Sequence, residues 1–598
     1  MHELSEKLYR WFDDSPRNRT WFALGWTTVY FAIVLLVVTP TYKVTDNSGI
    51  LSMIEDGAET PFISQILSGA LTFLYHEVSD RIPWFGYANF AALFWALALF
   101  VHALSSIASA RTVFLPLMSL FSLVFVMFLI RCGYNSSSIL LTGIATLAFV
   151  AYAREQKLTK WTALACGLAL AYGFLFRPRG MQGAMVVIGP ALLAFRAFRP
   201  SRYSLAMLLL FVLPIGVAGT AHVVWKTYGV SDEYRKFREF NRLRGKFHSY
   251  PISKANKENH RLFQINHWQR YHYLLFKDWF YVNEDIWNLE TLRNIFKYTE
   301  PLPEDELSPA VLADACTQLF EQFKTFLALL PLCIAAIVLA RDRRVLVWSS
   351  GYLLYLIALS LYLRIALRLP ERIGDPVFTL AFVSGIWILL SGESKFALRK
   401  GHASSHAFLA CWAAASIAFA AQDYFLTRRF AHRNAVFENR LTDFNLWFVN
   451  KVLFIQPAIL KSHDQNPLKV YEQTYESVPL GWRTQSPQFY DFLRRHEMQR
   501  GAELMPWVVD NPRVFFVWAR GRIGALIAFL RRDYGIAARV RAYSGLSDSR
   551  YLVFQLLTDP DPPKSMSIFN VVEVPTPFDR KPPVVDPADE EFEDDEDR

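Results

Sequence analysis

The chain has 598 residues, of which 53% are apolar and 20% charged, and its formal net charge is +9 at pH 7. The mean hydropathy is positive, at +0.17. The apolar residues gather into runs of about 17–23 residues, each long enough to cross a hydrocarbon core of about 30 Å as a helix. This pattern excludes a soluble multidomain protein and a disordered chain.

Eleven such apolar runs predict eleven transmembrane helices. They lie at residues 20–39, 88–108, 113–130, 135–153, 161–176, 180–196, 203–225, 323–340, 345–363, 376–392 and 405–421. We therefore expect a mainly α-helical, polytopic bundle over residues 20–421 with the lipid bilayer as its partner.

The Lys and Arg residues of the short loops predict how the bundle is oriented. The basic clusters are Lys7, Arg10, Arg17 and Arg19; Arg111; Arg154, Lys157 and Lys160; Arg196, Arg199 and Arg202; Arg341, Arg343 and Arg344; and Lys395, Arg399 and Lys400. All of them face the cytoplasm if the N-terminal segment 1–19 does. Membrane topology thus explains the basic charge, and no nucleic-acid partner is expected. The long polar segments 40–87, 226–322 and 422–598 then lie outside.

The first two outer segments contain predicted helices. In the first, Ile63–Tyr75 is apolar but too short to cross a membrane, which predicts a helix at the interface. In the second, Asp232–Phe247 interleaves aromatic with basic residues. We expect it to be an amphipathic helix that lies on anionic lipid.

The third outer segment predicts a small extracytoplasmic α+β domain at residues 422–560. Its expected strands are Val508–Trp518, Ala538–Ser544 and Tyr551–Leu557, and its expected helix, Arg520–Tyr534, is capped by Gly535. Beyond it, Pro and then acidic residues replace apolar ones, with nine acids in 586–598. This composition predicts a disordered acidic tail over 561–598.

Candidate catalytic acids lie in the first outer segment, close to the end of the first span. Asp46 belongs to the sequence Thr-Asp-Asn-Ser-Gly at 45–49, and Glu55 and Asp56 follow it. A carboxylate held at a membrane face can act as a general base or can hold a divalent cation against a phosphate. The alternative, which the pattern alone favours, is an ordinary turn. No Cys and His spacing indicates zinc, and no phosphate-binding glycine loop is present.

Several Arg residues lie where short outer loops should have few cations. These are Arg131, Arg177, Arg179, Arg364, Arg368 and Arg372. The last three are four residues apart and would share one face of a continuous helix, unless Pro370 ends that helix first. Arg side chains match phosphate oxygens, and so the cluster predicts binding of a lipid phosphate. The alternative for each single Arg is contact with lipid headgroups.

Several stretches resemble the GT-C class of integral-membrane glycosyltransferases. They are Asp46-Asn47, Met53–Gly57, Ser68–Tyr75 before Ile82–Gly86, Phe176-Arg177-Pro178, and Tyr271–Phe276 leading to Asp278–Phe280. The resemblance implies a catalytic acid in the first outer segment, a sugar donor on a polyprenyl phosphate, and an outer domain that helps bind the acceptor. Asn47 stands where such enzymes often have a second acid, and so the need for a divalent cation stays open.

The resulting hypothesis is a glycosyltransferase of a bacterial inner membrane. Asp46, or else Glu55 or Asp56, is expected to be the base, and Arg177, Arg179, Arg364, Arg368 and Arg372 are expected to bind the donor phosphate. Two alternatives remain: a polysaccharide or lipid transporter or polymerase, and a non-catalytic envelope protein. The non-catalytic alternative predicts that Asp46 does not cluster with the outer Arg residues.

Overall fold

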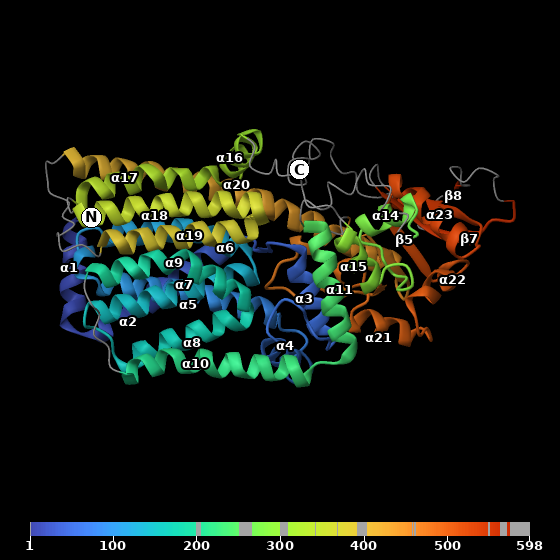
Figure 1. The fold of residues 1–598 in the computed structure, drawn as a ribbon, viewed down its shortest axis with the longest axis horizontal. Helices are drawn as coiled ribbons and strands as arrows, with labels where there is room; N and C mark the ends of the chain where they lie inside the picture. The colour runs from blue at the N-terminus through green and yellow to red at the C-terminus, as the bar shows by residue number, and fades with distance from the viewer. Residues whose placement is uncertain are drawn as a thin grey trace.

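The computed structural model describes residues 2–198, 205–249, 266–298, 309–340, 343–367, 369–390, 403–456, 459, 462–547, 551–561 and 571–574. Helices form a long bundle that makes up one end of the molecule (Figure 1). They are α1 (His2–Asp14), α2 (Pro16–Val37), α5 (Trp84–Ser106), α6 (Phe114–Ile130), α7 (Tyr134–Arg154), α8 (Lys160–Phe176), α9 (Pro178–Phe198), α10 (Leu205–Val224), α16 (Pro309–Phe323), α17 (Leu329–Ala340), α18 (Arg343–Tyr362), α19 (Glu371–Leu390) and α20 (Ala403–Trp447).

The predicted membrane spans each fall on a bundle helix. Within the described residues, eight helices are long and apolar enough to cross a membrane, and α6 and α8 are shorter apolar helices. The remaining predicted span coincides with α9, which contains Pro190 and is in neither group. The mainly α-helical polytopic bundle is thus confirmed, while the count of eleven crossings stays a prediction.

Helix α7 forms the centre of the bundle. Nearly all of its span is buried, whereas the long span that contains α10 packs on α8 at the edge of the bundle and keeps most of its residues half-buried or exposed. Small residues allow the close approach: a Cβ on Gly143 would lie 2.3 Å from the side chain of Leu380 in α19. Small side chains are the usual means of packing helices in lipid, where apolar burial alone does not favour association.

The polar segments gather at one end of the bundle, as the sequence predicted. Helices α3 (Thr45–Glu55), α4 (Gln65–Phe73) and α11 (Asp232–Ser249) lie between the bundle and the C-terminal sheet, while α1 lies at the opposite end (Figure 1). A two-stranded parallel pair, β1 (Thr41–Tyr42) with β2 (Arg131–Cys132), ties the end of α2 to the end of α6. Which end faces the cytoplasm stays a prediction.

Helix α11 confirms the predicted helix but not its expected surroundings. Its aromatic side chains Tyr234, Phe237, Phe240 and Phe247 are buried in the protein. The first two belong to the bundle core and the last two to the core of the outer domain. The expectation that this face lies on lipid is therefore wrong, because an amphipathic pattern fits a protein surface equally well.

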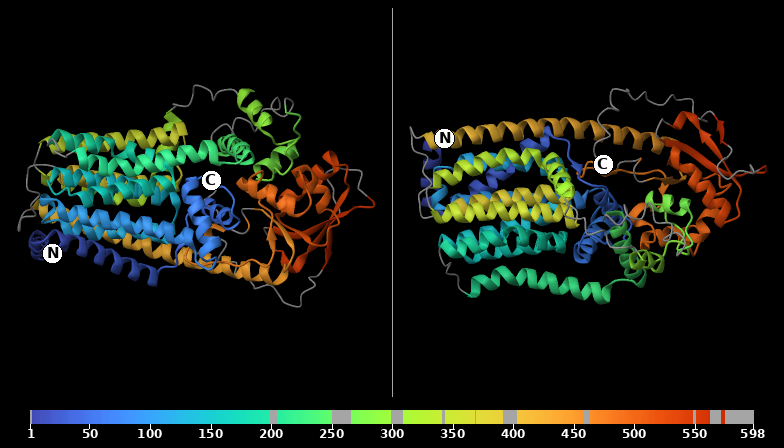
Figure 2. Two further views of the ribbon diagram at one scale, coloured as in Figure 1. Left: turned by 90° about the horizontal axis from the view of Figure 1, so that it is seen from below. Right: turned by 45° about the horizontal axis from the view of Figure 1, so that its top comes forward.

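Helix α20 connects the bundle to the outer domain. The last span was expected to end at 421, yet the helix continues to Trp447, so the predicted domain boundary falls inside it. Figure 2 shows this long orange helix running past the bundle to the sheet. Phe430, Phe437, Leu441 and Phe444 are buried at helical spacing. This stripe packs a helix that hydropathy alone does not extend.

The outer domain is built on a mixed six-stranded sheet, which confirms the α+β prediction. Its strand order is β4 (Glu476–Ser477), β3 (Val452–Ile455), β5 (Val514–Ala519), β7 (Tyr551–Thr558), β6 (Ala538–Tyr543) and β8 (Val571–Val574). One face packs on the end of α20. The other packs on helices α14 (Arg270–Lys277), α15 (Leu289–Tyr298), α21 (Pro487–Arg495), α22 (Leu504–Val508) and α23 (Ile523–Asp533).

Local predictions in this domain were confirmed in part. Helix α23 falls within the predicted helix, and Gly535 has a positive φ of 67°, as expected of a residue that ends a helix. The expected disordered tail, however, contains the edge strand β8, which pairs in parallel with β6. The acidic residues 586–598 lie outside the described residues.

Candidate functional site

Asp46 lies in the first turn of helix α3, at the end of the bundle that faces the outer domain. The alternative of a simple turn at 45–49 is thus wrong. Ile50, Met53 and Ile54 are fully buried at helical spacing. Their burial outweighs the turn preference of the Asp-Asn-Ser-Gly sequence, because each buried aliphatic side chain contributes about 1.5–3 kcal/mol.

Asn47 joins α3 to α7. Its side chain is fully buried; its Oδ1 accepts a hydrogen bond from the backbone N–H of Tyr134 at 3.2 Å, and its Nδ2 donates to the carbonyl of Val44 at 3.3 Å. A buried amide that uses both its donor and its acceptor is well satisfied. Asn47 therefore fixes the start of α3 against α7, and with it the position of the neighbouring Asp46.

Asp46 contacts Arg372 directly and is linked to Arg177 through Tyr134; both Arg residues were predicted for the site. Its Oδ2 forms an ion pair with Nη1 of Arg372 and accepts a long hydrogen bond, 3.5 Å, from the hydroxyl of Tyr134. Arg177 in turn donates to the Tyr134 hydroxyl at 3.2 Å and to Oδ1 of Asn135. Asp46, Tyr134, Arg177 and Arg372, which we call the Asp46 cluster, come from α3, α7, the α8–α9 junction and α19.

The geometry of the cluster leaves one carboxylate oxygen open. Both contacts of the Asp46 side chain are made by Oδ2, and within the described residues no hydrogen bond to Oδ1 is found. The carboxyl group is 17% exposed. An oxygen with water access and a free lone pair can accept a proton from a substrate hydroxyl.

Two further ion pairs hold the elements that carry the cluster. Lys43 and Asp375 form a buried pair, and Arg131 pairs with Glu371 at 3.1 Å. The first pair joins the segment before α3 to α19, and the second joins strand β2 to α19; both acids lie within the first five residues of α19. Arg131, one of the predicted outer cations, is thus used in an ion pair with Glu371 that connects β2 to α19.

Glu55 and Asp56 do not join the Asp46 cluster. Glu55 is nine residues after Asp46 in one helix, which places it about 13.5 Å along the axis and on the opposite face. Asp56 accepts a hydrogen bond from Nε2 of Gln488, while Arg483 donates to Oγ of Ser52 at 2.8 Å. This end of α3 therefore docks on the outer domain.

The carboxyl group of Glu55 has an altered proton affinity. Surrounding protein atoms, and next the charge of Asp56, raise its pKa to about 7. The side chain keeps access to water nonetheless. A carboxyl group with a pKa near neutrality can exchange protons at physiological pH, but it lies away from the Arg residues of the cluster.

The remaining predicted Arg residues have different positions. Arg179 is exposed in the first turn of α9. Arg364 lies in the π-helical turn η6 (Leu363–Leu367), and within the described residues it makes no ion pair with Asp46. Arg368 lies outside the described residues. Because α19 begins at Glu371, after Pro370, the helix that would align Arg364 with Arg372 is interrupted.

Tyr134 is a member of the cluster that the sequence analysis missed. It begins α7 at the same predicted outer end as Asp46 and Arg177. A phenolic hydroxyl at the first residue of a span is a signal that could have been used, because Tyr is amphipathic and marks a membrane boundary.

The cluster offers no evident multi-ligand metal site. Within the described residues no group of three or more His, Cys, Asp or Glu side chains is placed to hold a metal ion. A divalent cation thus remains an expectation without assigned ligands.

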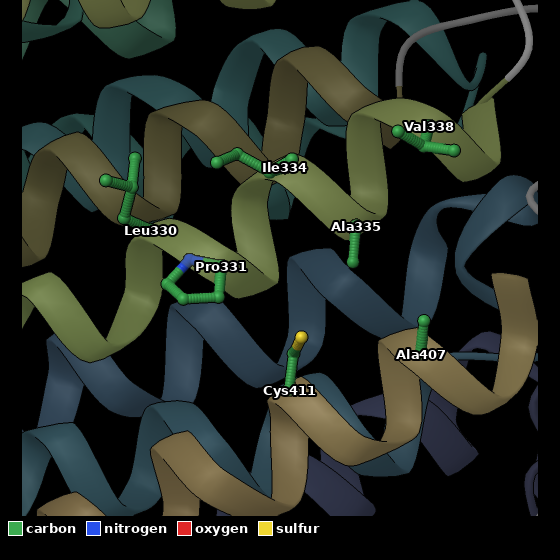
Figure 3. Close-up of a pocket in the computed structure, with 7 residues that line it drawn as sticks. All are labelled: Leu330, Pro331, Ile334, Ala335, Val338, Ala407 and Cys411. Carbon is green, nitrogen blue, oxygen red and sulfur yellow. The ribbon is translucent and has the colours of Figure 1, made fainter.

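A cavity of about 400 Å³ lies elsewhere, between α17 and α20 (Figure 3). Leu330, Ile334 and Val338 line one wall, and Ala407 and Cys411 the other. These side chains are apolar, and Leu330, Ile334 and Val338 are exposed at the surface of the bundle. The cavity therefore has no chemistry of its own to add to the site.

Comparison with known proteins gives a distant structural likeness. No family model matches the chain, and no curated protein matches it. Among solved structures it is similar to ArnT from Cupriavidus metallidurans in the apo state, with 11% identity, a TM-score of 0.34, and coverage of 89% of this chain and 97% of that one. The same protein bound to undecaprenyl phosphate gives 12% identity, a TM-score of 0.33, and coverage of 89% and 98%.

The likeness is too distant to assign a role to any residue of this chain.

Proposed function

We propose that this protein is a membrane glycosyltransferase that moves a sugar from a polyprenyl-phosphate donor to an envelope glycan or lipid acceptor, at the outer face of a bacterial inner membrane. The observation that supports it is the Asp46 cluster: a water-accessible carboxylate and two Arg side chains at the end of a bundle of apolar helices. The headgroup of a membrane lipid lies at that level, and its phosphate needs cations.

Asp46 is the base in this proposal. Its Oδ1 takes the proton of the acceptor hydroxyl as the hydroxyl oxygen attacks the anomeric carbon of the donor sugar. The bond from that carbon to the phosphate oxygen breaks, and the lipid phosphate leaves with the electron pair. Attack opposite the leaving group inverts the configuration at the anomeric carbon.

Arg177 and Arg372 stabilise the departing phosphate. The charge on its oxygens increases as the bond breaks, so cations fixed beforehand lower the barrier. Arg177 is fixed by Tyr134 and Asn135, and Arg372 is fixed by Asp46. Arg179 lies at the start of α9, and Arg364 lies just after the end of α18. In this proposal both are further contacts for the lipid headgroup.

Substitution of Asp46 tests the proposal. Asp46→Asn keeps the size of the side chain but removes a proton acceptor, and general-base loss reduces turnover by about 10²–10⁴-fold. Purified protein in lipid nanodiscs would be supplied with polyprenyl-phosphate sugars and assayed for product. Asp80→Asn, an exposed acid of the same outer segment, is the matched control and should keep full turnover.

Arg177→Ala separates binding from chemistry. It should weaken binding of the lipid phosphate as well as turnover, whereas Asp46→Asn should leave binding intact. Arg81→Ala, which removes an exposed cation of the same outer segment, is the control. Full turnover in Asp46→Asn would exclude Asp46 as the base. A wild-type protein that neither binds nor uses any such donor would favour the transporter or envelope-protein alternatives.

A further inference from the structure

Arg244 occupies a position where helix α11 should carry an apolar residue. Phe237, Phe240 and Phe247 are buried, and with Arg244 they form a stripe with spacings of three and four residues along one helix face. Arg244 is itself only 4% exposed. A cation in the buried stripe of an otherwise amphipathic helix needs a reason, because removing a charge from water is costly.

The contacts of Arg244 hold its guanidinium without neutralising it. Oδ1 of Asn241 accepts from Nε at 3.2 Å and also from Nη2. The guanidinium lies over the ring of Trp279 at 4.3 Å from the centroid. Its Nη1 is buried and has no hydrogen-bond partner within the described part of the chain. No carboxylate there forms an ion pair with it.

Arg244 lies close enough to Asp46 for their charges to interact. Burial lowers the pKa of Arg244, and the groups that raise it are Tyr281 and then Asp46. Asp46 is already paired with Arg372 through Oδ2. Arg244 and Arg372 thus both interact with the Asp46 carboxylate, and Arg177 is linked to it only through Tyr134. This leaves the site with an excess of positive charge that suits an anionic ligand.

Arg244 reaches this site from the outer domain rather than from the bundle. Its neighbours on α11, Phe240 and Phe247, belong to the core of the outer domain, whereas Arg177 and Arg372 begin or end bundle helices. Trp279, on which the guanidinium rests, has a positive φ of 64°, which is uncommon for a bulky residue. Such strain often lies next to functional sites.

We propose that Nη1 of Arg244 binds a phosphate group of a substrate that enters between the bundle and the outer domain; the role of this phosphate as part of a glycosyl-transfer substrate rests on the proposed function. Asn241 and Trp279 hold the guanidinium in a fixed plane, so the free N–H is oriented before the ligand arrives. The phosphate belongs either to the polyprenyl donor or to a phosphorylated acceptor, and the two are separated by experiment.

The test measures lipid binding by the purified full-length protein and three variants. Arg244→Met removes the cation and keeps much of the apolar volume. Arg244→Lys keeps the charge but loses the planar fork that rests on Trp279. Arg242→Met removes an exposed cation two residues away on the same helix and is the matched control. The probes are undecaprenyl phosphate, phosphatidic acid and the uncharged undecaprenol.

Arg244→Met should weaken binding of a phosphate-bearing probe by about 10- to 100-fold, the usual cost of a charge-assisted hydrogen bond. Undecaprenol binding should not change, and Arg242→Met should bind like the wild type. Loss confined to undecaprenyl phosphate assigns the donor phosphate, and loss confined to phosphatidic acid assigns an acceptor phosphate. Arg244→Lys should show a smaller loss of the same kind, and it decides the matter if Arg244→Met does not fold.

Unchanged affinity for both phosphate lipids in the Arg244 variants would overturn this inference and leave the role of Asp46 untouched. The opposite result is also distinct: if binding depends on Arg244 but the wild type transfers no sugar, the phosphate site stands and the proposed glycosyl transfer falls. A wild type that binds neither phosphate lipid would refute both.

Discussion

The buried ion pair between Lys43 and Asp375 is predicted to fix the position of Asp46. The two side chains are only 3% and 10% exposed. Lys43 is three residues before Asp46, and Asp375 is three residues after Arg372. The pair therefore joins the two elements that meet in the Asp46 cluster, and it does so next to the parallel strands β1 and β2.

The expected loss of unfolding free energy depends on which charge each substitution leaves buried without a partner. Lys43→Met leaves the Asp375 carboxylate buried without its partner, which costs about 3–5 kcal/mol of unfolding free energy. Asp375→Leu leaves the ammonium group of Lys43 unpaired, where burial already lowers its pKa. The double variant removes both charges, and replacing a buried pair with apolar side chains is often close to neutral.

The assay is equilibrium unfolding of the purified protein in mixed micelles, followed by near-ultraviolet circular dichroism. Each single variant should lose stability, and the double variant should recover most of it. Lys469→Met, which breaks the partly exposed pair with Glu438 at 2.7 Å, is the control and should cost about 1 kcal/mol or less.

A second measurement links this pair to function. Turnover should fall in Lys43→Met because α3 and Asp46 are no longer held against α19, and it should recover with stability in the double variant. A Lys43→Met protein as stable and as active as the wild type would refute the reasoning. Stability that falls without loss of turnover would show that the pair supports the fold but does not position Asp46.

Three further predictions concern α3 and the topology. Asn47→Asp should lower the unfolding free energy by about 3 kcal/mol or more, because it places a charge at a fully buried position; an unchanged free energy would contradict this. The folded state raises the pKa of Glu55 from 4.5 to about 7, so the part of stability linked to Glu55 is fully present below about pH 4.5 and is lost as pH rises to about 7. Glu55→Gln should remove this pH dependence from unfolding curves, and a persisting slope would assign it to another group. A reporter enzyme active only outside the cytoplasm should work when fused after Trp447 and fail after Arg344; the reverse result would invert the topology.

Properties that depend on short stretches of sequence could be predicted. Hydropathy over about 20 residues locates a span, because the length of an apolar helix must match the hydrocarbon core. All the predicted spans accordingly fall on helices. The strand alternation of Ala538–Tyr543 and the C-cap at Gly535 are also local, since each depends on a few neighbouring residues.

Predictions from short sequence patterns were wrong where contacts with distant parts of the chain determine the local structure or its surroundings. The Asp-Asn-Ser-Gly sequence favours a turn, but Ile50, Met53 and Ile54 find a buried site only if the segment is a helix. The face of α11 reads as lipid-binding, but its aromatic side chains pack in protein cores. The end of α20 lacks a hydropathy signal because it crosses to the outer domain.

The sequence by itself determined that Asp46 and a set of Arg residues lie on one side of a membrane bundle. Only the tertiary structure decided which of them meet. Asp46 and Arg372 are 326 residues apart in the chain, and their contact depends on how α3 packs against α7 and α19. The helical form of α3 places Glu55 on the opposite face, and the packing brings Tyr134 and Arg244 near Asp46. The physical reason is that spans and strands form from interactions between near neighbours, whereas a site is made by side chains that packing alone brings within bonding distance.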